Sequence, residues 1–586
     1  MKIPIHLGVL AAALTLGQAS IADDTNSSGH PGKRPNIIVI LADDYGKDAA
    51  SLYYPATEAA EFPETAPTLA LAKLAEQGIL FTNAWAQPAC TATRGTRSLG
   101  TYPSTNGVGT ALGVRTPRFG APGSLFDGVE FPPTMVNPHD PNFIQRLAKN
   151  AGYKTYKLGK WHEVIDGGDP VLGVQDVLDA GFDAFYGQLG GGPTGGYGGG
   201  ADPTPNWVPD NSLGLGETNE FLTSALISQA IKFIKHNGDD PYYIALDFAA
   251  PHFPYEVAPG PGAPAPLENQ SDWRTLHPVI HANVIEQVKA AWGGTYPTAG
   301  TRVAPGPNST AAARAAFKSL IAYMDVQIKR LMEHVDLKNT YIIFAGDNGT
   351  QGNIAQFPPF FGAVEPPWDV NKSKTTLYRN GYEVPFIVAG PHIAKRGRSN
   401  DDPVNTADIY ATVLEIIGVP QPHQSVGESF SFMNVLHGGE GYRDYNVAES
   451  YAPTLTVGGT VTHPGTYFAR DGRVVGDSRF RLIAKAVIAD DDTFVCRSGS
   501  VQDPLLDCLN QHTGIYEKDI ELEFYDLYSD PFENDALVVD EMSADQLKGF
   551  HKLCKAINKV SKGAVYYQNA GDCKKDGSNL LDIDPI

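Results

Sequence analysis

Short apolar runs alternate with amphipathic stretches along most of the chain, beginning near residue 35. Four of these runs have the length and composition of buried strands: residues 36–41, 153–158, 242–248 and 340–345. Between them, apolar residues recur at helical spacing, most regularly from Leu222 to Phe233 and from Phe317 to Val335. Alternation of this kind is typical of helices that cover both faces of a parallel or mixed sheet. Residues 33–430 are therefore predicted to form an α/β domain whose large, mixed, mostly parallel sheet is sandwiched by helices.

The pattern changes beyond residue 430, where short β-like runs are scattered along the chain. Residues 479–486 and 522–527 are the clearest of these runs, and an amphipathic stretch follows at 544–560. Strands followed by a separate helix are typical of an α+β arrangement. We therefore predict a smaller C-terminal α+β domain at residues 431–586.

Two irregular segments interrupt the predicted α/β domain. Residues 187–200 are dense in glycine, and residues 256–307 are rich in proline, alanine and glycine. Neither ends in the Gly-Lys-Ser/Thr sequence of a phosphate-binding P-loop. Both are interpreted as long surface loops, and either is a candidate to frame a substrate opening.

Length and charge narrow the class of protein. A chain of 586 residues exceeds the usual size of one domain, so at least two domains are expected. With 42% hydrophobic and 19% charged residues, the composition is that of an ordinary globular protein. The formal net charge of -21 repels phosphate backbones, so nucleic acid is not an expected partner. An anionic substrate would need a locally basic pocket.

The first 22 residues have the features of a secretory signal peptide. Lys2 precedes an apolar run at residues 7–16, and small residues follow at Ala19, Ser20 and Ala22. No later segment is long and apolar enough for a transmembrane helix, so no stable membrane insertion is expected. The chain is therefore predicted to be periplasmic or secreted.

The five cysteines fit an oxidising compartment. Cys496 and Cys508 lie close together in the sequence, as do Cys554 and Cys573, so each pair is a candidate disulfide. Cys90 has no such partner. An unpaired cysteine in a secreted protein is a reactive thiol, an intermolecular bridge, a modified residue or a buried free thiol.

Polar side chains follow the four predicted strands at the point where each one ends. Asp43 and Asp44 follow residues 36–41, Lys160 and His162 follow 153–158, His252 follows 242–248, and Asp347 and Asn348 follow 340–345. Any single pair could be a turn or cap, because Asp and Asn are common turn residues after a strand. However, ligands of open α/β sheets bind beyond the carboxyl ends of the strands, so the set together predicts a functional site at one edge.

The acidic members of this set indicate a hard cation. They offer only carboxylate and amide oxygens, which suits calcium or magnesium and argues against zinc. The residues concerned are Asp43, Asp44, Asp347 and Asn348. Three carboxylates held together repel one another unless a cation lies between them, and such a cation would also hold an anionic substrate oxygen.

The lone cysteine begins a short run of small residues that ends in an arginine. Cys90 lies two residues before Ala92 and four before Arg94, and Gly95 follows. This spacing resembles the signature of the type I, formylglycine-dependent sulfatases of the alkaline phosphatase superfamily, cysteine-x-Pro/Ala-x-Arg with a glycine after it. Other segments resemble sulfatase blocks in the family's order: residues 41–46, 159–162, 181–186, 250–254, 347–349, Lys374 with 384–385, and 525–531. The resemblance covers about residues 34–534.

This resemblance implies a modified nucleophile and a metal site. In the family, the signature cysteine is oxidised to formylglycine, whose hydrated aldehyde is the nucleophile, so a formylglycine-generating maturation enzyme is an expected partner. The implied calcium ligands, with magnesium as the alternative ion, are Asp43, Asp44, Asp347, Asn348 and the modified side chain of Cys90.

The resemblance also implies a role for each basic residue. Arg94 would orient and stabilise the aldehyde hydrate, and His162 would hydrogen-bond one of its hydroxyls. Lys160 and Lys374 would hold the sulfate oxygens, and His252 is the candidate general acid for the leaving alcohol. Fixed cations suit such a substrate, because a sulfate ester is an anion and must be neutralised before a nucleophile can reach the sulfur.

Three features depart from the family's pattern. Ala92 stands where proline is commoner, and Leu99 replaces a common threonine. After Lys374, the family's usual Glu-Gly-Gly-x-Arg run is replaced by a run from Arg379 to Glu383 in which the charges are exchanged. Because those charges would meet a substrate or each other, the resemblance alone assigns no substrate.

The sequence therefore predicts a sulfatase that hydrolyses sulfate esters of a small molecule or, more specifically, of a sulfated saccharide. One alternative is a phosphonate or phosphodiester hydrolase of the same superfamily, because the same metal and nucleophile would serve either anion. A second alternative is a catalytically silent, calcium-dependent carbohydrate-binding protein. That protein would keep Cys90 unmodified and would bind its ligand without releasing sulfate.

Overall fold

The computed structural model has the predicted large sheet at its centre. It describes residues 34–53, 65–109, 118–119, 130–131, 136–163, 170–189, 207–209, 221–261, 274–303, 311–352, 372–450, 472–486, 520–563 and 573–574. The predicted signal peptide, the pair Cys496 and Cys508, and most of the predicted loop at 187–200 lie outside these ranges. Those predictions therefore stay predictions.

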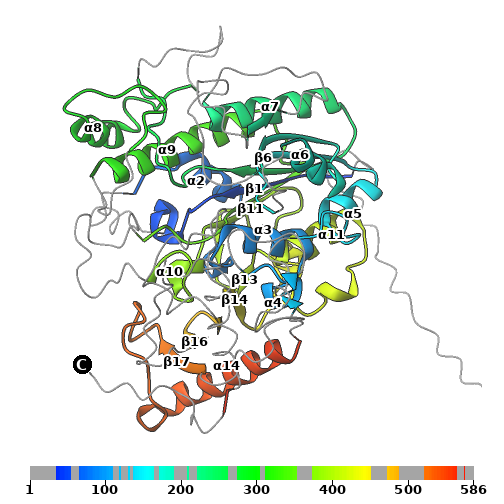
Figure 1. Cartoon of the computed structure of the whole chain (residues 1–586), viewed down its shortest axis with the longest axis vertical. Helices are drawn as coiled ribbons and strands as arrows, with labels where there is room; N and C mark the ends of the chain where they lie inside the picture. The colour runs from blue at the N-terminus through cyan, green and yellow to red at the C-terminus, as the bar shows by residue number, and fades with distance from the viewer. Residues whose placement is uncertain are drawn as a thin grey trace, which may run out of the picture.

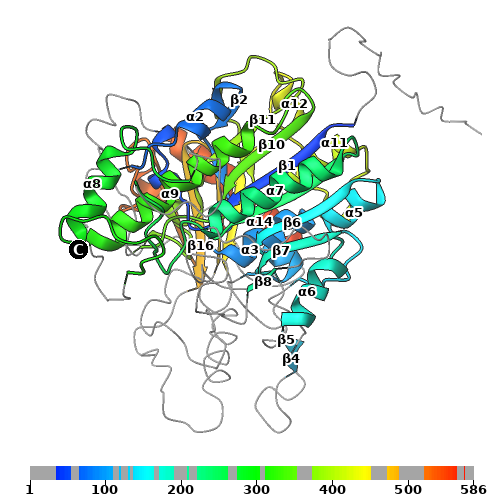
Figure 2. The same ribbon diagram turned by 90° about the horizontal axis from the view of Figure 1, so that it is seen from above.

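The central sheet of the described chain has the strand order β12-β2-β11-β10-β1-β9-β6-β7-β8, and Figure 2 shows these strands fanning from β2 to β8. Their bounds are β1 (Asn36–Ala42), β2 (Gly78–Phe81), β6 (Lys154–Lys160), β7 (Ala184–Gln188), β8 (Trp207–Pro209), β9 (Tyr242–Phe248), β10 (Thr340–Gly346), β11 (Phe386–Ala389) and β12 (Arg398–Asn400). Strands β10, β1, β9, β6 and β7 run parallel, whereas β11 and β8 are antiparallel to their neighbours. The predicted mixed, mostly parallel sheet is confirmed.

Helices cover both faces of this sheet, as Figures 1 and 2 show. One face packs against α2 (Leu69–Glu76), α7 (Leu222–Asn237) and α9 (Ala311–Met332). The other packs against α3 (Cys90–Leu99), α5 (Ile144–Asn150), α6 (Pro170–Asp179), α11 (Asp408–Ile417) and α12 (Met433–Leu436). In β1, Ile38 and Ile40 face the first layer and Val39 faces the second, all fully buried. A strand covered on both faces therefore appears in the sequence as one continuous apolar run.

The four predicted strands are β1, β6, β9 and β10, and the two predicted helices are α7 and α9. At its C-terminal end, α9 stops at Met332, whereas the apolar stripe continued to Val335. The backbone changes there to a tight turn, in which His334 N donates to Leu331 O. Val335 still packs against the core, so the apolar pattern at this end indicated burial and not the extent of the helix.

The predicted loop at residues 256–307 is not entirely loop, because it contains α8 (Ala282–Ala291). Val284, Ile285 and Val288 have helical spacing and are buried against the same core as α9. The prediction of a surface loop through this stretch was therefore wrong. The surrounding Pro, Ala and Gly residues obscured a short amphipathic helix.

A second, antiparallel sheet lies below the first in Figure 1, in the order β14-β15-β16-β17. Its strands are β14 (Asn446–Ser450), β15 (Gly472–Gly476), β16 (Phe480–Ala486) and β17 (Ile520–Asp526). Helix α14 (Ala544–Gly563) covers one face through Phe550, Leu553 and Ile557. The other face packs on Trp85 and Tyr382 of the larger part. The predicted C-terminal α+β region is confirmed, while the division at residue 430 stays a prediction.

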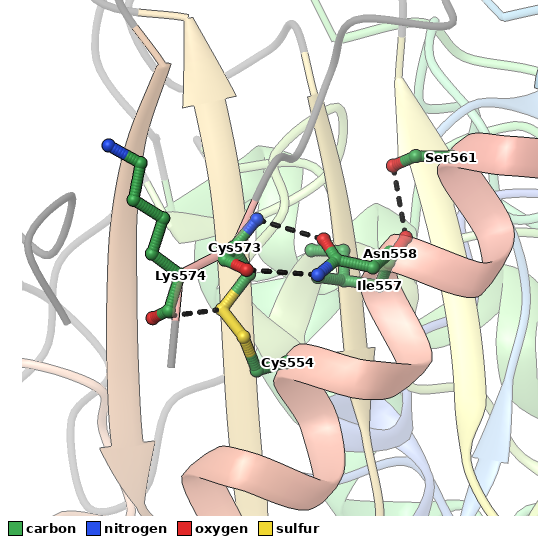
Figure 3. The surroundings of a disulfide bond; sticks show 6 residues. All are labelled: Cys554, Ile557, Asn558, Ser561, Cys573 and Lys574. Atoms are coloured by element: carbon green, nitrogen blue, oxygen red, sulfur yellow. Dashed lines mark hydrogen bonds between the residues drawn. A yellow bond between two sulfur atoms is a disulfide. The ribbon is translucent and has the colours of Figure 1, made fainter. Parts of the chain in front are cut away.

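A disulfide joins Cys554 of α14 to Cys573, as predicted for this pair. Figure 3 shows how Asn558 secures the same segment. Its Nδ2 donates to Cys573 O at 2.9 Å, and Cys573 N donates to its Oδ1 at 2.9 Å. The segment around Cys573 is thus held to α14 by one covalent bond and two hydrogen bonds.

The described chain also contains several short strands and helices. They are β3 (Ala84–Trp85), β4 (Arg118–Phe119), β5 (Glu130–Phe131), β13 (Val404–Asn405), α4 (Pro103–Asn106) and α10 (Arg379–Tyr382). Within the described ranges, none of the helices combines the length and apolar composition that a bilayer crossing requires.

Candidate active site

The carboxyl ends of β1 and β10 bring the predicted acidic residues together. The two strands pair in parallel with Ala42 opposite Gly346, so the residues that follow lie at the same edge. Asp347 N donates to Ala42 O at 3.0 Å, and Asp44 N donates to Asp347 Oδ1 at 3.0 Å. Asp44 adopts a left-handed backbone conformation (φ 60), which aspartate tolerates better than most residues and which turns the chain directly after β1.

Three oxygen atoms of this acidic cluster have no hydrogen-bond partner among the described residues. They are Asp43 Oδ1, Asp44 Oδ2 and Asn348 Oδ1, and all three side chains are fully buried. Leaving a buried polar atom unsatisfied costs about 1 to 3 kcal/mol. Because a hard cation takes carboxylate and amide oxygens as ligands, the residues present fit the predicted calcium or magnesium ion.

Cys90 is the first residue of α3 and faces this cluster, with only 1% of its surface exposed. Its sulfur and the ligand atoms of Asp43, Asp44 and His252 all lie within 4.8 Å of one another. Lys374 Nζ lies 3.4 Å from the same sulfur. The side chain at position 90 is therefore surrounded by oxygen ligands on one side and by a cationic group on another.

Arg94 lies one helical turn after Cys90 and is fully buried. Its Nη2 donates to Asp347 Oδ2 at 2.8 Å and lies 3.5 Å from Asp43 Oδ2. Its Nη1 donates to the Lys160 carbonyl at 3.1 Å and to Asp247 Oδ2 at 2.8 Å. The guanidinium thus connects the acidic cluster to residues of β6 and β9.

Lys160 and His162 reach the site from the end of β6. Lys160 Nζ forms a buried ion pair with Asp43 Oδ2. His162 has a left-handed backbone conformation (φ 50), and its Nδ1 lies 3.4 Å from Thr91 Oγ1. Its Nε2 has no hydrogen-bond partner among the described residues, so this atom is available for a group at the centre of the site.

His252 and Lys374 form the accessible side of the site. Their side chains are 18% and 10% exposed, whereas those of Asp43, Asp44 and Arg94 are fully buried. His252 Nδ1 donates to the Phe253 carbonyl, and its Nε2 lies 3.7 Å from Asp44 Oδ2. Lys374 Nζ pairs with Asp44 Oδ1. A substrate would therefore meet these two side chains first.

Burial and crowding make the titration of these groups unusual. Burial alone would raise the pKa of Asp43, but the charges of Lys160 and His252 hold it well below its usual range. Burial and the charge of Asp43 raise the pKa of Asp347 well above its usual range. Burial also raises the pKa of the Cys90 thiol, which disfavours the thiolate that is the nucleophilic form.

The exchanged charges between Arg379 and Glu383 meet each other rather than this site. Glu383 Oε2 pairs with Arg379 at 3.1 Å and with Lys47 at 3.3 Å, and Glu383 Oε1 pairs with Arg481 of the C-terminal sheet at 2.8 Å. Glu383 is buried between the two sheets. The departure from the family's pattern is therefore compensated inside the protein.

The structure brings every predicted site residue into one cluster, and it adds two that the sequence interpretation missed. Asp247 lay inside a predicted apolar strand, where a single charged residue was the only signal. Thr91 lay inside the signature segment at a position that the signature leaves open. Chemically, the cluster combines a buried reactive position, an oxygen-rich cation site and several fixed positive charges, which suits attack on an anionic ester.

Comparison with known proteins points to one family. The sequence profile of a family described as "Sulfatase" matches residues 35–419. An arylsulfatase of Klebsiella aerogenes is 24% identical over 68% of this chain and 89% of its own length. An ulvan-active sulfatase of Formosa agariphila is 23% identical over 68% of this chain and 64% of its own length.

The fold is also similar to that of solved structures. One of them holds its substrate, D-glucosamine-2-N,6-O-disulfate. It superposes with a TM-score of 0.55 at 17% identity, covering 92% of this chain and all of the other. At this identity the similarity extends to the fold, including the C-terminal sheet region that lies beyond the matched profile.

Proposed function

The chain belongs to the sulfatase family, whose members are sulfuric ester hydrolases, and we propose that it releases sulfate from a sulfated carbohydrate through a nucleophile made from Cys90. The observation that carries this proposal is the position of the Cys90 sulfur, within 4.8 Å of the ligand atoms of Asp43, Asp44 and His252. The unmodified thiol is poorly suited to the task, because burial raises its pKa. Oxidation by a maturation enzyme to formylglycine, followed by addition of water to the aldehyde, would supply a hydroxyl nucleophile, and calcium, with magnesium as the alternative, would supply positive charge beside it.

The acidic cluster would hold the cation. Asp43, Asp44 and Asn348 each present an oxygen that has no partner among the described residues, which supports their role as ligands. Asp347 is proposed as a further ligand, together with the modified side chain of residue 90. In the structure its two oxygens accept hydrogen bonds from Asp44 N and from Arg94.

Basic side chains around the cluster would bind and orient the substrate. Lys160 and Lys374 are proposed to hold the sulfate oxygens, and the partial exposure of Lys374 makes it the first to meet an incoming anion. Arg94 would orient the modified side chain from the same helix. His162 would hydrogen-bond a hydroxyl of that side chain through Nε2, the atom left without a partner among the described residues.

His252 is proposed to give a proton to the leaving alcohol. Its Nδ1 donates to the Phe253 carbonyl, which fixes the ring and leaves Nε2 toward the site. Burial lowers the pKa of His252, whereas the nearby charges of Asp44 and Asp43 act in the opposite direction. A bound sulfate would add another negative charge beside the ring and so favour its protonated, proton-donating form.

The names of similar proteins support a sulfated carbohydrate as the substrate class. One relative is named for activity on ulvan, and one solved structure of the same fold holds a disulfated glucosamine. The predicted signal peptide is consistent with an environmental polysaccharide as the source. We therefore propose that the substrate is a sulfated saccharide and that the protein acts in the periplasm or outside the cell.

Two measurements on protein matured in its native host test this proposal. Mass analysis of the peptide that contains residue 90 is expected to show formylglycine, and a panel of sulfated saccharides is expected to show sulfate release. Cys90→Ala is the control and should fold but not turn over. An unmodified cysteine with ligand binding and no sulfate release would favour the silent binding protein, and preferential turnover of an aryl phosphodiester would favour the phosphodiesterase.

A further inference from the structure

A group of buried charged residues lies directly behind the candidate active site. It consists of Arg97 on α3, Lys157 on β6, Asp247 on β9 and Glu163, which follows β6; we call it the rear ionic cluster. The four residues are 0 to 1% exposed. None was predicted from the sequence to take part in the site. Burying four charged side chains costs desolvation free energy, so a functional role would explain why they lie together.

Asp247 is the centre of the rear ionic cluster. Arg97 Nη1 donates to both of its oxygens, at 2.7 and 2.9 Å, and Lys157 Nζ pairs with its Oδ2. Arg94 Nη1 donates to the same Oδ2 at 2.8 Å. One carboxylate thus contacts three cationic side chains from α3 and β6.

A second acidic residue, Glu163, contacts the other end of the Arg97 guanidinium. Glu163 Oε1 accepts hydrogen bonds from Arg97 Nη2 at 3.0 Å and from Ser98 Oγ at 3.1 Å. Arg97 is therefore held at both ends of its guanidinium, by Asp247 and by Glu163. This arrangement fixes the position of the Asp247 carboxylate independently of Arg94.

Arg94 has one end in this cluster and the other in the active site. Its Nη1 contacts Asp247, and its Nη2 contacts Asp347 at 2.8 Å. The guanidinium is planar and rigid, so the atom that holds Nη1 also sets the direction of Nη2. Asp247 Oδ2 at 2.8 Å, together with the Lys160 carbonyl at 3.1 Å, therefore sets where Arg94 meets the acidic cluster.

We propose that Asp247 is a positioning residue for the reaction, which holds the Arg94 guanidinium in register with the acidic cluster and the side chain at position 90. The inference rests on the proposed function and deepens it, because it assigns a role to a residue that touches neither substrate nor cation. Arg97 serves this role by holding both oxygens of Asp247, whereas Lys157 adds a compensating positive charge.

The test must separate positioning from stability, because removing a buried anion leaves cations uncompensated. Asp247→Asn alone leaves Lys157 without its partner and is expected to lower the melting temperature. The informative protein is therefore the double variant D247N/K157M, which removes one anion and one cation together. Lys157→Met alone is the matched control, because it keeps the contact between Asp247 and Arg94.

Each protein is assayed as matured full-length chain, with turnover normalised to the formylglycine content of the residue 90 peptide. The double variant is expected to melt close to the wild type and to lose about 100-fold in kcat, the scale of loss from a slightly misplaced catalytic group. Its KM should change little, since the lysines that face the sulfate are untouched. Lys157→Met should keep most of the wild-type kcat.

A crystal structure of the double variant gives a readout that does not depend on turnover. The Arg94 guanidinium is expected to move so that Nη2 no longer lies within hydrogen-bond distance of Asp347. Wild-type kcat in the double variant, or an unmoved guanidinium, would overturn the inference. Failure of the charge-balanced variant to fold would also overturn it, because Asp247 would then serve stability alone.

Failure of the proposed function is a different result. In that case the wild-type protein, with formylglycine at position 90, releases no sulfate from any ester tested. The guanidinium position in the double variant still decides the inference about Asp247, because it is measured without substrate.

Discussion

Two buried ionic clusters of this protein look alike in composition and differ in how their oxygens are used. In the active-site cluster, Asp43, Asp44 and Asn348 each have a buried oxygen with no partner among the described residues. The second cluster consists of Glu383, Lys47, Arg379 and Arg481, and we call it the bridging cluster. Both carboxylate oxygens of Glu383 form ion pairs with the three basic side chains. Several partnerless oxygens gathered in one place suit a bound cation, whereas oxygens that are all paired suit a structural connection.

The two clusters also sit differently in the fold. The active-site cluster lies at the carboxyl ends of parallel strands, where an open α/β sheet binds its ligands. The bridging cluster lies between the two sheets, since Arg481 belongs to β16 and Glu383 directly follows α10. Variants of the active-site cluster should therefore lower turnover, and variants of the bridging cluster should lower stability. Measuring both quantities for each variant tests this distinction.

The largest effect is expected from Asp347→Asn in the active-site cluster. Loss of one carboxylate should weaken cation binding and lower kcat/KM by at least about 10³-fold, equivalent to about 4 kcal/mol. The melting temperature in the presence of a chelator should stay close to that of the wild type. The reason is that, without a cation, burial and the charge of Asp43 already disfavour an ionised Asp347, so losing this charge offsets the one hydrogen bond, from Arg94 or Asp44 N, that the amide can no longer accept. Initial rates and thermal melts in chelator provide the two measurements.

Retained activity in this variant would remove Asp347 from the proposed ligand set. A large drop in melting temperature in chelator would instead show that the acidic cluster stabilises the fold by itself. Either result would show that the active-site cluster and the bridging cluster do not divide turnover and stability between them as proposed.

Glu383→Gln should have the opposite profile. It leaves three cationic side chains around a neutral amide, and breaking a buried ion pair costs about 3 to 5 kcal/mol of unfolding free energy. Turnover per folded, formylglycine-containing molecule should be unchanged, because none of these groups contacts the active-site cluster. Glu76→Gln is the control: Glu76 pairs with Lys73 on an exposed helix surface, where such pairs contribute little.

The pH dependence of stability sharpens the same comparison. Burial alone would raise the pKa of Glu383, but Arg379 and Lys47 hold it below its usual range in the folded protein. A depressed folded pKa adds stability above the unfolded pKa of about 4.3 and loses it as pH falls below that value. The gap in melting temperature between wild type and Glu383→Gln should therefore be full at neutral pH and shrink below about pH 4. A gap that stays constant from neutral to acidic pH would contradict the ion pairing.

Added cation should distinguish the clusters by mass action. Calcium at about one hundred times its dissociation constant should raise the unfolding free energy of the metal-free wild type by about 3 kcal/mol. Glu383→Gln should keep this response and Asp347→Asn should lose most of it. Calcium is expected to act more strongly than magnesium, because flexible coordination by several protein oxygens suits the larger ion. Equal responses in both variants would place the cation elsewhere.

The sequence predicted the active-site cluster because its residues follow the strands that hold them. Asp43 and Asp347 each come directly after an apolar run, and parallel pairing of β1 with β10 then places them together. The same logic identified Lys160, which is the last residue of β6, and His162 just after it. Whether a residue follows a strand depends only on the local sequence, so it can be predicted without knowing which strands pair.

The contacts behind and beside that site could not be predicted in the same way. Asp247 is one charged residue in an otherwise apolar strand, and its partners Arg97 and Lys157 come from other elements. Glu383 was noted for its exchanged charge, but its partner Arg481 lies in the other sheet. These contacts depend on how distant segments pack, and a single sequence contains no record of that packing.

The smallest effect expected in the active-site cluster is a change in substrate affinity at its accessible side. Lys374→Met removes an ammonium that is 10% exposed, contacts Asp44 and lies 3.4 Å from the Cys90 sulfur. Loss of one charge-assisted hydrogen bond to sulfate should raise KM about tenfold, equivalent to roughly 1.4 kcal/mol. Lys372→Met is the matched control, because Lys372 lies two residues away and donates to the Glu533 carbonyl instead. Steady-state kinetics on the same sulfated saccharide should separate the two lysines, and equal KM values for both variants would place the sulfate away from Lys374.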